Sequence, residues 1–261
     1  MTNLLTRRDR TGIRAAVLVA GAVFASACES TPILLYHSVG EPIDPPRWVA
    51  KEALRAQLVG LLDEGFEPIT ASELDAIEDG VIPGPRQPLL VTFDDGYRNF
   101  YDQAFPVLRE LGVRSTLFLI SSRVEESAEQ RSDAPAPQYV TWQEVEEMRG
   151  QGVEMQSHTR THRRLRALSD DEIRAELWDS KRELEARLGA EVSVIAYPFG
   201  SASSRVERIA EEVGYQSGHG VEAGLGGRMA RQRVSVHGEH ETEDVSRSLD
   251  ASWWGRASGV R

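Results

Sequence analysis

Two short polar segments, each following an apolar run, constrain this chain more than any other feature. One apolar run precedes the adjacent Asp94 and Asp95, and a second precedes His158 and His162. Both arrangements are typical of buried strands that end in loops. A carboxylate and two imidazoles that meet at strand ends can bind a metal such as zinc and leave a position open for water. The other aspartate is then available as a base, so the pattern indicates a metal-assisted hydrolase.

Strands and helices alternate along the rest of the chain, with no sign of an internal domain boundary. We expect strands at 33–37, 67–69, 89–93, 115–120, 153–156, 192–196, 215–217 and 233–236, and helices at 51–64, 70–77, 99–111, 141–149, 169–188 and from after residue 200 to 213. The segment 121–138 is expected to be an exposed loop. This order predicts an α/β fold with a parallel sheet, closed or open, whose polar residues gather at the carboxyl ends of the strands.

Composition limits the class of partner. The chain has 261 residues, 40% of them hydrophobic, which is enough for one sizeable domain, and its formal net charge is −11. Because nucleic-acid binding depends on neutralising phosphates, an acidic chain of this kind is a poor candidate for it. We therefore expect no nucleic-acid partner.

The N-terminus is typical of an export signal. Four arginines occur between residues 7 and 14, and the short apolar stretch 15–27 follows. Cys28, the only cysteine, comes directly after Ala25-Ser26-Ala27, which resembles a bacterial lipobox, although Leu is typical where Ala25 stands. We expect residues 1–27 to be a signal peptide, Cys28 to be the lipidated mature N-terminus, and 31–261 to be one domain. The same three residues also suit an ordinary signal cleavage site, which would give a secreted protein without an anchor.

The motifs resemble those of the polysaccharide deacetylases of the NodB-homology type, carbohydrate esterase family 4. Thr-Phe-Asp-Asp-Gly-Tyr at 92–97 matches the first motif of that family and His-x-x-x-His at 158–162 the second, and the similarity extends from Leu34 to about Val236. The resemblance implies a distorted (β/α) barrel of one domain and metal-dependent removal of acetyl groups from sugars. It implies Asp95, His158 and His162 as metal ligands and Asp94 as the base acting on metal-bound water. Zinc is the first choice of metal, with cobalt, nickel or iron as alternatives.

The turn Tyr197-Pro198-Phe199-Gly200 resembles the third motif of the family. The resemblance implies that the N–H of Phe199, after Pro198, helps to hold the oxyanion, and that Phe199 and Tyr197 wall the sugar site. The usual arginine of this motif is absent, and Ala196 stands near its place. Arg233, before the last expected strand, is a candidate to orient Asp94 instead.

Two histidines are candidates for the general acid. Leu-Leu-Tyr-His at 34–37 resembles the branch of the family that includes poly-N-acetylglucosamine deacetylases, where an N-terminal Tyr-His supplies the acid. This favours His37, with His237 as the alternative. His219 and His240 are expected to lie solvated in polar loops. Trp253-Trp254 could stack on a sugar or cap the barrel.

Together these features predict an exported protein, held at a membrane by a lipid anchor or released to the periplasm or exterior, that deacetylates an N-acetylated polysaccharide. Two alternatives stay open: an O-acetyl esterase of the xylan type, and a carbohydrate-binding lipoprotein of the same fold without turnover.

Overall fold

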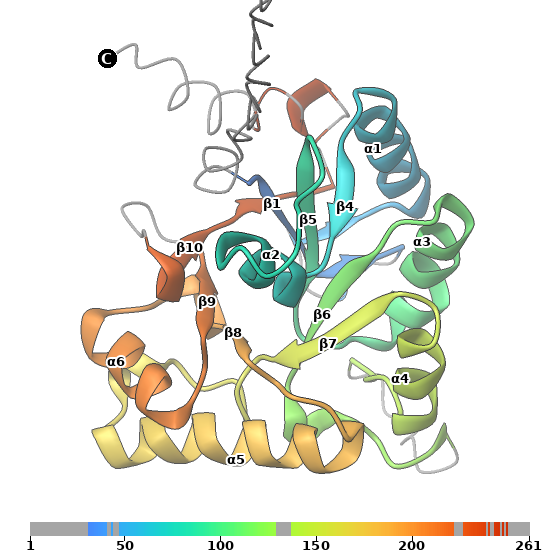
Figure 1. Cartoon of the computed structure of the whole chain (residues 1–261). Coiled ribbons are helices and arrows are strands. Elements are labelled where there is room, and N and C mark those ends of the chain that lie inside the picture. Colours follow the sequence, from blue (N-terminus) through green and yellow to red (C-terminus); the bar gives the residue numbers. More distant parts are fainter. Residues whose placement is uncertain are drawn as a thin grey trace, which may run out of the picture.

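A nine-stranded parallel sheet curls into an almost closed barrel with helices around it (Figure 1). This computed structural model describes residues 31–40, 43, 47–128, 137–221, 227–238, 240, 243–245, 247 and 249. The expected signal segment 1–27, Cys28 and Trp253-Trp254 lie outside these residues. Within them, no helix is both long and apolar enough to cross a membrane.

The elements follow the predicted alternation. In chain order they are β1 Ile33–Tyr36, β2 Ser38–Val39, β3 Trp48–Val49, α1 Lys51–Asp63, β4 Glu67–Ile69, α2 Ala71–Glu78, β5 Pro88–Phe93, the π-helical turn η2 Phe100–Ala104, α3 Phe105–Leu111, β6 Ser115–Leu119, η3 Ser121–Arg123, α4 Trp142–Arg149, β7 Val153–Ser157, η5 Leu165–Ala167, α5 Asp170–Leu188, β8 Val194–Ala196, η6 Pro198–Gly200, α6 Ser204–Val213, β9 Ser217–Gly220, η7 Arg228–Ala230, β10 Arg231–Gln232 and β11 Val234–Ser235.

The helix ends are those that the capping residues predict. Ser169 and Glu172 form a capping box at the start of α5, and Gly189 ends that helix in the left-handed conformation. Thr141 and Glu144 cap α4 in the same way. The expected helix 99–111 is different, because it begins with the π-helical turn η2 before α3 continues it.

The segment 231–235 closes the barrel. Its first part, β10, pairs with β9 in parallel, and its second part, β11, pairs with β1 in parallel. Arg233 lies between these two pairings, and its N–H donates to the carbonyl of Gly220. Arg233 thus stands where the two ends of the sheet are joined, and its side chain is fully buried.

The barrel is distorted on the side of β4. This strand pairs with the first half of β5, at 88–90, whereas β6 pairs with β5 only at Thr92 and Phe93. The strands β7 and β8 pair at a single position, Ser157 and Ile195. The strands therefore splay apart where they begin and meet where they end, at the edge that follows Phe93.

Helix α2 fills the splayed end of the barrel, whereas α1, α3, α4, α5 and α6 lie outside the strands (Figure 1). Its apolar side packs on an interior cluster that includes Leu90, Phe118 and Val194. Its buried Asp75 accepts hydrogen bonds from Ser217 Oγ at 2.7 Å and from Arg231 Nη2 at 2.6 Å. The interior is thus closed at this end, and the opposite end is left for the site.

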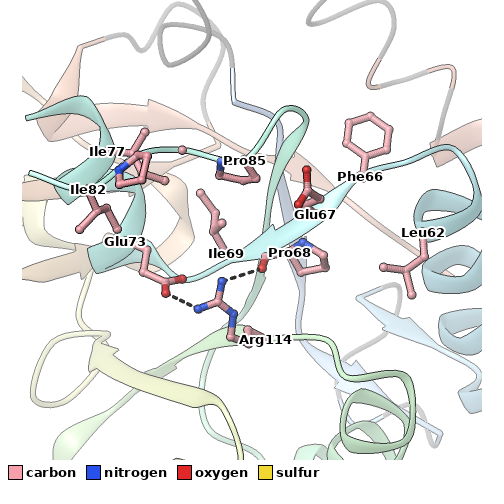
Figure 2. A pocket seen from close by; sticks show the side chains of 12 residues that line it. Leu62, Phe66, Glu67, Pro68, Ile69, Glu73, Ile77, Ile82, Pro85 and Arg114 are labelled. Atoms are coloured by element: carbon pink, nitrogen blue, oxygen red, sulfur yellow. Dashed lines mark hydrogen bonds and ion pairs between the residues drawn. The ribbon is translucent and has the colours of Figure 1, made fainter. Parts of the chain in front are cut away.

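A pocket of about 550 Å³ opens beside α2 at the edge where β4, β5 and β6 begin (Figure 2). Its walls are mainly apolar and include Ile69, Ile77 and Ile82. Arg114 crosses one side, where it forms an ion pair with Glu73 and donates to the carbonyl of Pro68 at 3.3 Å. None of the predicted site residues lines this pocket, because they follow the other ends of the strands.

Candidate active site

Three of the predicted site residues converge where β5 and β7 end. Asp95 comes two residues after β5, His158 directly follows β7, and His162 lies four residues further on. Ligand atoms of all three lie within 4.8 Å of one another. The Oδ1 atom of Asp95 is 3.5 Å from His158 Nε2 and 3.3 Å from His162 Nε2. The strand β6 lies between β5 and β7 and aligns their ends. At its own end, the carbonyl of Leu119 accepts a hydrogen bond from the N–H of His158.

The backbone of this region is strained. Among the described residues other than glycine, a positive φ occurs at Asp95 (75°), Thr159 (65°), His162 (64°) and Phe199 (61°). Residues with a side chain adopt this conformation at a cost of about 1–3 kcal/mol each, and they tend to cluster at functional sites. Neighbouring contacts hold the His-x-x-x-His turn in it: Thr161 N–H donates to Glu176 at 2.8 Å, and His162 N–H donates to Thr159 Oγ1 at 3.1 Å.

The donor set of this cluster fits a divalent cation. His158 Nδ1 lies 2.8 Å from the carbonyl oxygen of Ala196, which can only accept, so Nδ1 carries the proton and Nε2 presents its lone pair to Asp95. Burial lowers the pKa of both His158 and His162 to about 4, which keeps the imidazoles neutral at pH 7. A carboxylate oxygen and a bare imidazole nitrogen are both acceptors, and a cation between them would bind both. Nitrogen and oxygen ligands of this kind suit zinc and related metals.

Asp94 is held by Arg233. Both side chains are buried, and Arg233 donates from Nη1 to Oδ1 and from Nη2 to Oδ2, each at 2.7 Å. Burial alone would raise the pKa of Asp94, but the charges of Arg233 and His158 outweigh it and hold that pKa well below its ordinary value. Asp94 Oδ2 lies 3.8 Å from His158 Nε2. Asp94 is therefore an ionised carboxylate beside the ligand cluster. The suggestion that Arg233 orients Asp94 agrees with this contact.

His37 lies next to Asp94 across two paired strands. Tyr36 pairs with Phe93 in register, and the N–H of Asp94 donates to the carbonyl of Tyr36, so the residues that follow the two strands are neighbours. Burial and Arg233 dominate the pKa of Asp94, and the charge of His37 lowers it further. His37 is thus within electrostatic reach of the base.

The alternative histidine, His237, has a different neighbour. It follows β11 on the other side of β1, and its N–H donates to His240 Nδ1 at 3.0 Å. The two rings lie 5.4 Å apart. Burial lowers the pKa of His237, and the charge of His240 lowers it further.

The turn after β8 brings Phe199, but not Tyr197, to the surface of the site. Phe199 is 39% exposed, and the centroid of its ring lies 4.8 Å from that of His162. Pro198 and Gly200 are buried on either side of it. Tyr197 is fully buried, so the expectation that its ring walls the sugar site is wrong. Strand alternation explains this, because Tyr197 shares the face of Ile195 and packs in the cluster that includes Val206 and Ile209 of α6, opposite to the face of Val194 and Ala196. The positive φ of Phe199 then leaves that side chain partly exposed.

The expectation that His219 lies solvated in a polar loop is wrong. It lies in β9, paired with Ala196 on one side and Arg231 on the other, and is fully buried. Burial lowers its pKa well below the ordinary value, so the ring is neutral. The segment Ser217–Gly220 has no apolar run, which is why the expected strand at 215–217 ended before it. His240 is only partly buried, against the ring of His237.

The fold and these contacts define a barrel protein with a candidate cation site at its strand ends. Residues 82–218, more than half of the chain, match the polysaccharide deacetylase family. The chain therefore belongs to that family.

Curated relatives agree with this assignment. The Bacillus subtilis (strain 168) polysaccharide deacetylase homologue YxkH is 29% identical over 211 residues, which cover 78% of this chain and 71% of the relative. The poly-beta-1,6-N-acetyl-D-glucosamine N-deacetylase of Escherichia coli K12 is 25% identical over 225 residues, 73% of this chain and 34% of the relative. This chain thus matches only about a third of that longer protein.

Solved structures share the fold. A Streptococcus pyogenes deacetylase in complex with acetate superimposes with a TM-score of 0.73 and 26% identity, over 84% of this chain and 97% of the other. A polysaccharide deacetylase from Bacillus cereus gives a TM-score of 0.70 and 26% identity, over 84% of this chain and 68% of the other. The distorted barrel predicted from the resemblance is confirmed.

Proposed function

We propose that this protein is an exported, metal-dependent deacetylase acting on N-acetylated sugars of a polysaccharide. The observation that carries the proposal is the pair of adjacent carboxylates with different partners. Asp95 faces two neutral imidazoles, as a metal ligand requires, while the charge of Asp94 is balanced by Arg233. The relative from Escherichia coli named as a poly-beta-1,6-N-acetyl-D-glucosamine N-deacetylase supports the choice of amide over ester.

Asp95, His158 and His162 would hold the metal, with zinc preferred and cobalt, nickel or iron as alternatives. A bound divalent cation would lower the pKa of a water molecule and polarise the acetyl carbonyl. Asp94 then takes the proton from the attacking water. Its two bonds to Arg233 keep it ionised and fix the carboxylate, so it is ready to accept that proton.

His37 is the proposed general acid, which gives a proton to the leaving nitrogen. Its position after Tyr36, beside Asp94, supports this role over His237, whose ring lies 5.4 Å from that of His240. The N–H of Phe199 is the proposed donor to the oxyanion. The strained backbone of Phe199 supports that role, because a strained conformation of this kind is often retained at a reacting centre.

Export and anchoring rest on the N-terminal sequence. We propose that residues 1–27 are removed, that Cys28 is lipidated, and that the domain 31–261 is thereby held at a membrane. The partner of the site is then an acetylated polysaccharide or oligosaccharide outside the cytoplasm.

Acetate release by the purified domain tests the reaction. The substrates are an N-acetylglucosamine oligomer linked β-1,6, a chitin oligomer and an O-acetylated xylan oligomer of equal length. We expect release from at least one N-acetylated oligomer and at least tenfold lower kcat/KM on the xylan. A reversed preference would favour the O-acetyl esterase. Binding without release from any of them would favour the carbohydrate-binding alternative.

A further inference from the structure

Two exposed arginines lie over aromatic rings at the rim of the site. The guanidinium carbon of Arg164 is 4.4 Å from the centroid of Phe199, and that of Arg123 is 5.2 Å from the centroid of Tyr139. Phe199 contacts the ring of His162. Arg123 also donates to the hydroxyl of Tyr139. The two arginines come from different loops, after β7 and after β6.

Both rings belong to the neighbourhood of the metal ligands. Tyr139 forms an antiparallel bridge with Tyr97, two residues after Asp95, and the two rings lie 5.5 Å apart. The turn η3, which ends at Arg123, lies beside the loop of the metal ligands, because the N–H of Ser122 donates to the carbonyl of Arg160. Arg123 and Arg164 therefore present positive charge to the same small region of the surface.

These two arginines differ from their neighbours in how they are paired. Arg160 forms an ion pair with Glu183 at 2.7 Å, and Arg163 forms one with Glu172 at 3.0 Å. Among the described residues, by contrast, no carboxylate lies within ion-pair distance of Arg123 or Arg164. In a chain with a net charge of −11, carboxylates are abundant. Most arginines of the described surface form an ion pair with one. At the rim of the site, Arg123 and Arg164 thus carry two positive charges that no described carboxylate pairs with.

A guanidinium that lies over an aromatic ring keeps N–H donors for another partner. Arginine donors form a fork that matches the two oxygens of a carboxylate or a phosphate. A neutral acetylated glycan has no charge that would use these donors. The amine that deacetylation produces is cationic, and the same two arginines would repel it.

We propose that Arg123 and Arg164 are specificity residues that bind an anionic group of the substrate, so that the acetylated sugar belongs to a polysaccharide bearing carboxylates or phosphates. This inference rests on the proposed deacetylase function and narrows its substrate class. The aromatic rings hold the two guanidinium groups in position, and the anionic group of a neighbouring sugar unit pairs with them while the acetyl group reaches the metal ligands.

Binding and turnover are measured with three probes of equal length. The first is a neutral chitin hexasaccharide, the second alternates N-acetylglucosamine with glucuronic acid, and the third joins N-acetylglucosamine units through phosphodiesters. Dissociation constants are measured by calorimetry in the metal-loaded Asp94→Asn background, and kcat/KM is measured for acetate release with Asp94 present. Each set includes Arg123→Gln, Arg164→Gln and the matched control Arg109→Gln. Arg109 also lies over a ring, that of Phe105 at 5.7 Å, but on α3.

We expect at least one anionic probe to bind roughly tenfold more tightly than chitin at low ionic strength, which is the size of one charge-assisted contact. High salt should abolish the preference. Arg123→Gln and Arg164→Gln should each reduce it severalfold, and Arg109→Gln should not. Which of the two anionic probes binds more tightly distinguishes carboxylate from phosphate.

Equal binding of all three probes would overturn the inference, as would arginine variants that weaken the neutral and the anionic probes alike, because that result means that the arginines only support the rings. The inference and the proposed function fail in different ways. A binding preference without acetate release from any probe supports the inference and refutes the deacetylase. Acetate release with equal kcat/KM on neutral and anionic probes supports the deacetylase and refutes the inference about the arginines.

Discussion

Replacing Arg233 by methionine should separate the function of Asp94 from the binding of the metal. Arg233 touches Asp94 through two hydrogen bonds of 2.7 Å between fully buried groups, and it does not belong to the ligand cluster. Methionine has a similar length and no charge, so Arg233→Met leaves the carboxylate buried without its counter-ion. We expect the variant to retain its metal and to lose most of its activity.

The structure gives the size of the effect. Removing one partner of a buried ion pair costs about 3–5 kcal/mol, because the remaining charge stays out of water. Since one pKa unit corresponds to about 1.4 kcal/mol, the pKa of Asp94 should rise by roughly 2 to 4 units in the variant. The acid limb of kcat/KM should therefore move to higher pH. At neutral pH Asp94 stays ionised, but the carboxylate has lost the two hydrogen bonds that orient it, so activity there should fall at least tenfold.

The free energy of unfolding should also depend on pH through the ion pair of Asp94 and Arg233. The pKa of Asp94 in the folded protein lies below its ordinary value of 3.8, so the ion pair stabilises the fold above that pH, and this stability is lost as the pH falls through the folded-state pKa. In Arg233→Met burial raises that pKa instead, so the variant loses stability as the pH rises. The difference in unfolding free energy between the two proteins should be largest near pH 7, should begin to shrink when the pH falls to the raised pKa of Asp94 in the variant, and should continue to shrink below pH 3.8.

The assay is urea unfolding in the presence of a chelator at several pH values, together with acetate release from the metal-loaded proteins. Arg231→Met is the matched control. Arg231 is nearly buried and forms an ion pair of 2.6 Å with Asp75, and this pair lies away from the site. This control should also lose stability but should keep the acid limb of kcat/KM in place. An acid limb that does not move in Arg233→Met, or moves equally in Arg231→Met, would refute the argument.

Three further predictions concern single residues. Asp94→Asn should retain the metal and lose turnover, whereas His158→Ala should lose both, as measured by metal content and acetate release; equal metal loss in the two would contradict the separate roles. His37→Gln should lower kcat by on the order of 10²–10⁴, the range of a general acid; a loss of that size in His237→Gln instead would transfer the role. Cys28→Ala should release the protein from membranes, and unchanged membrane fractionation would reject the lipid anchor.

Local signals predicted the parts of the site that lie close together in sequence. The adjacent Asp94 and Asp95 and the His-x-x-x-His spacing of His158 and His162 are each carried by one turn of chain after an apolar strand. The strand order then brings the two turns together. Capping boxes such as that of Ser169 and Glu172 also located helix starts, because both partners lie within four residues.

Long-range closure was harder to predict. Arg233 reaches Asp94 across 139 positions of sequence, and only the pairing of 231–235 with both β9 and β1 puts it there. A lone arginine before a short apolar run has no periodicity that would mark it. The absence of the usual arginine near Ala196 was the one available signal that another residue must balance Asp94.

Buried strands without an apolar run were missed for a related reason. The strand Ser217–Gly220 contains two glycines, a serine and His219, which is a typical loop composition, yet all four residues are buried. Gly218 explains part of this pattern, because a Cβ there would lie 2.4 Å from the carbonyl oxygen of Met229 and 2.6 Å from the hydroxyl of Tyr197. The close packing of β9 against its neighbours thus selects small residues, and no hydrophobic pattern is left to detect.

The dependence of acetate release on the amount of bound metal tests the central claim most directly. The purified domain is freed of metal with a chelator and then titrated with zinc, while metal content and the rate of acetate release from an N-acetylated oligosaccharide are measured together. We predict that release is abolished in the metal-free protein, rises in proportion to bound zinc, and saturates at one equivalent per chain held by Asp95, His158 and His162. Release that persists unchanged after the metal is removed would contradict the account.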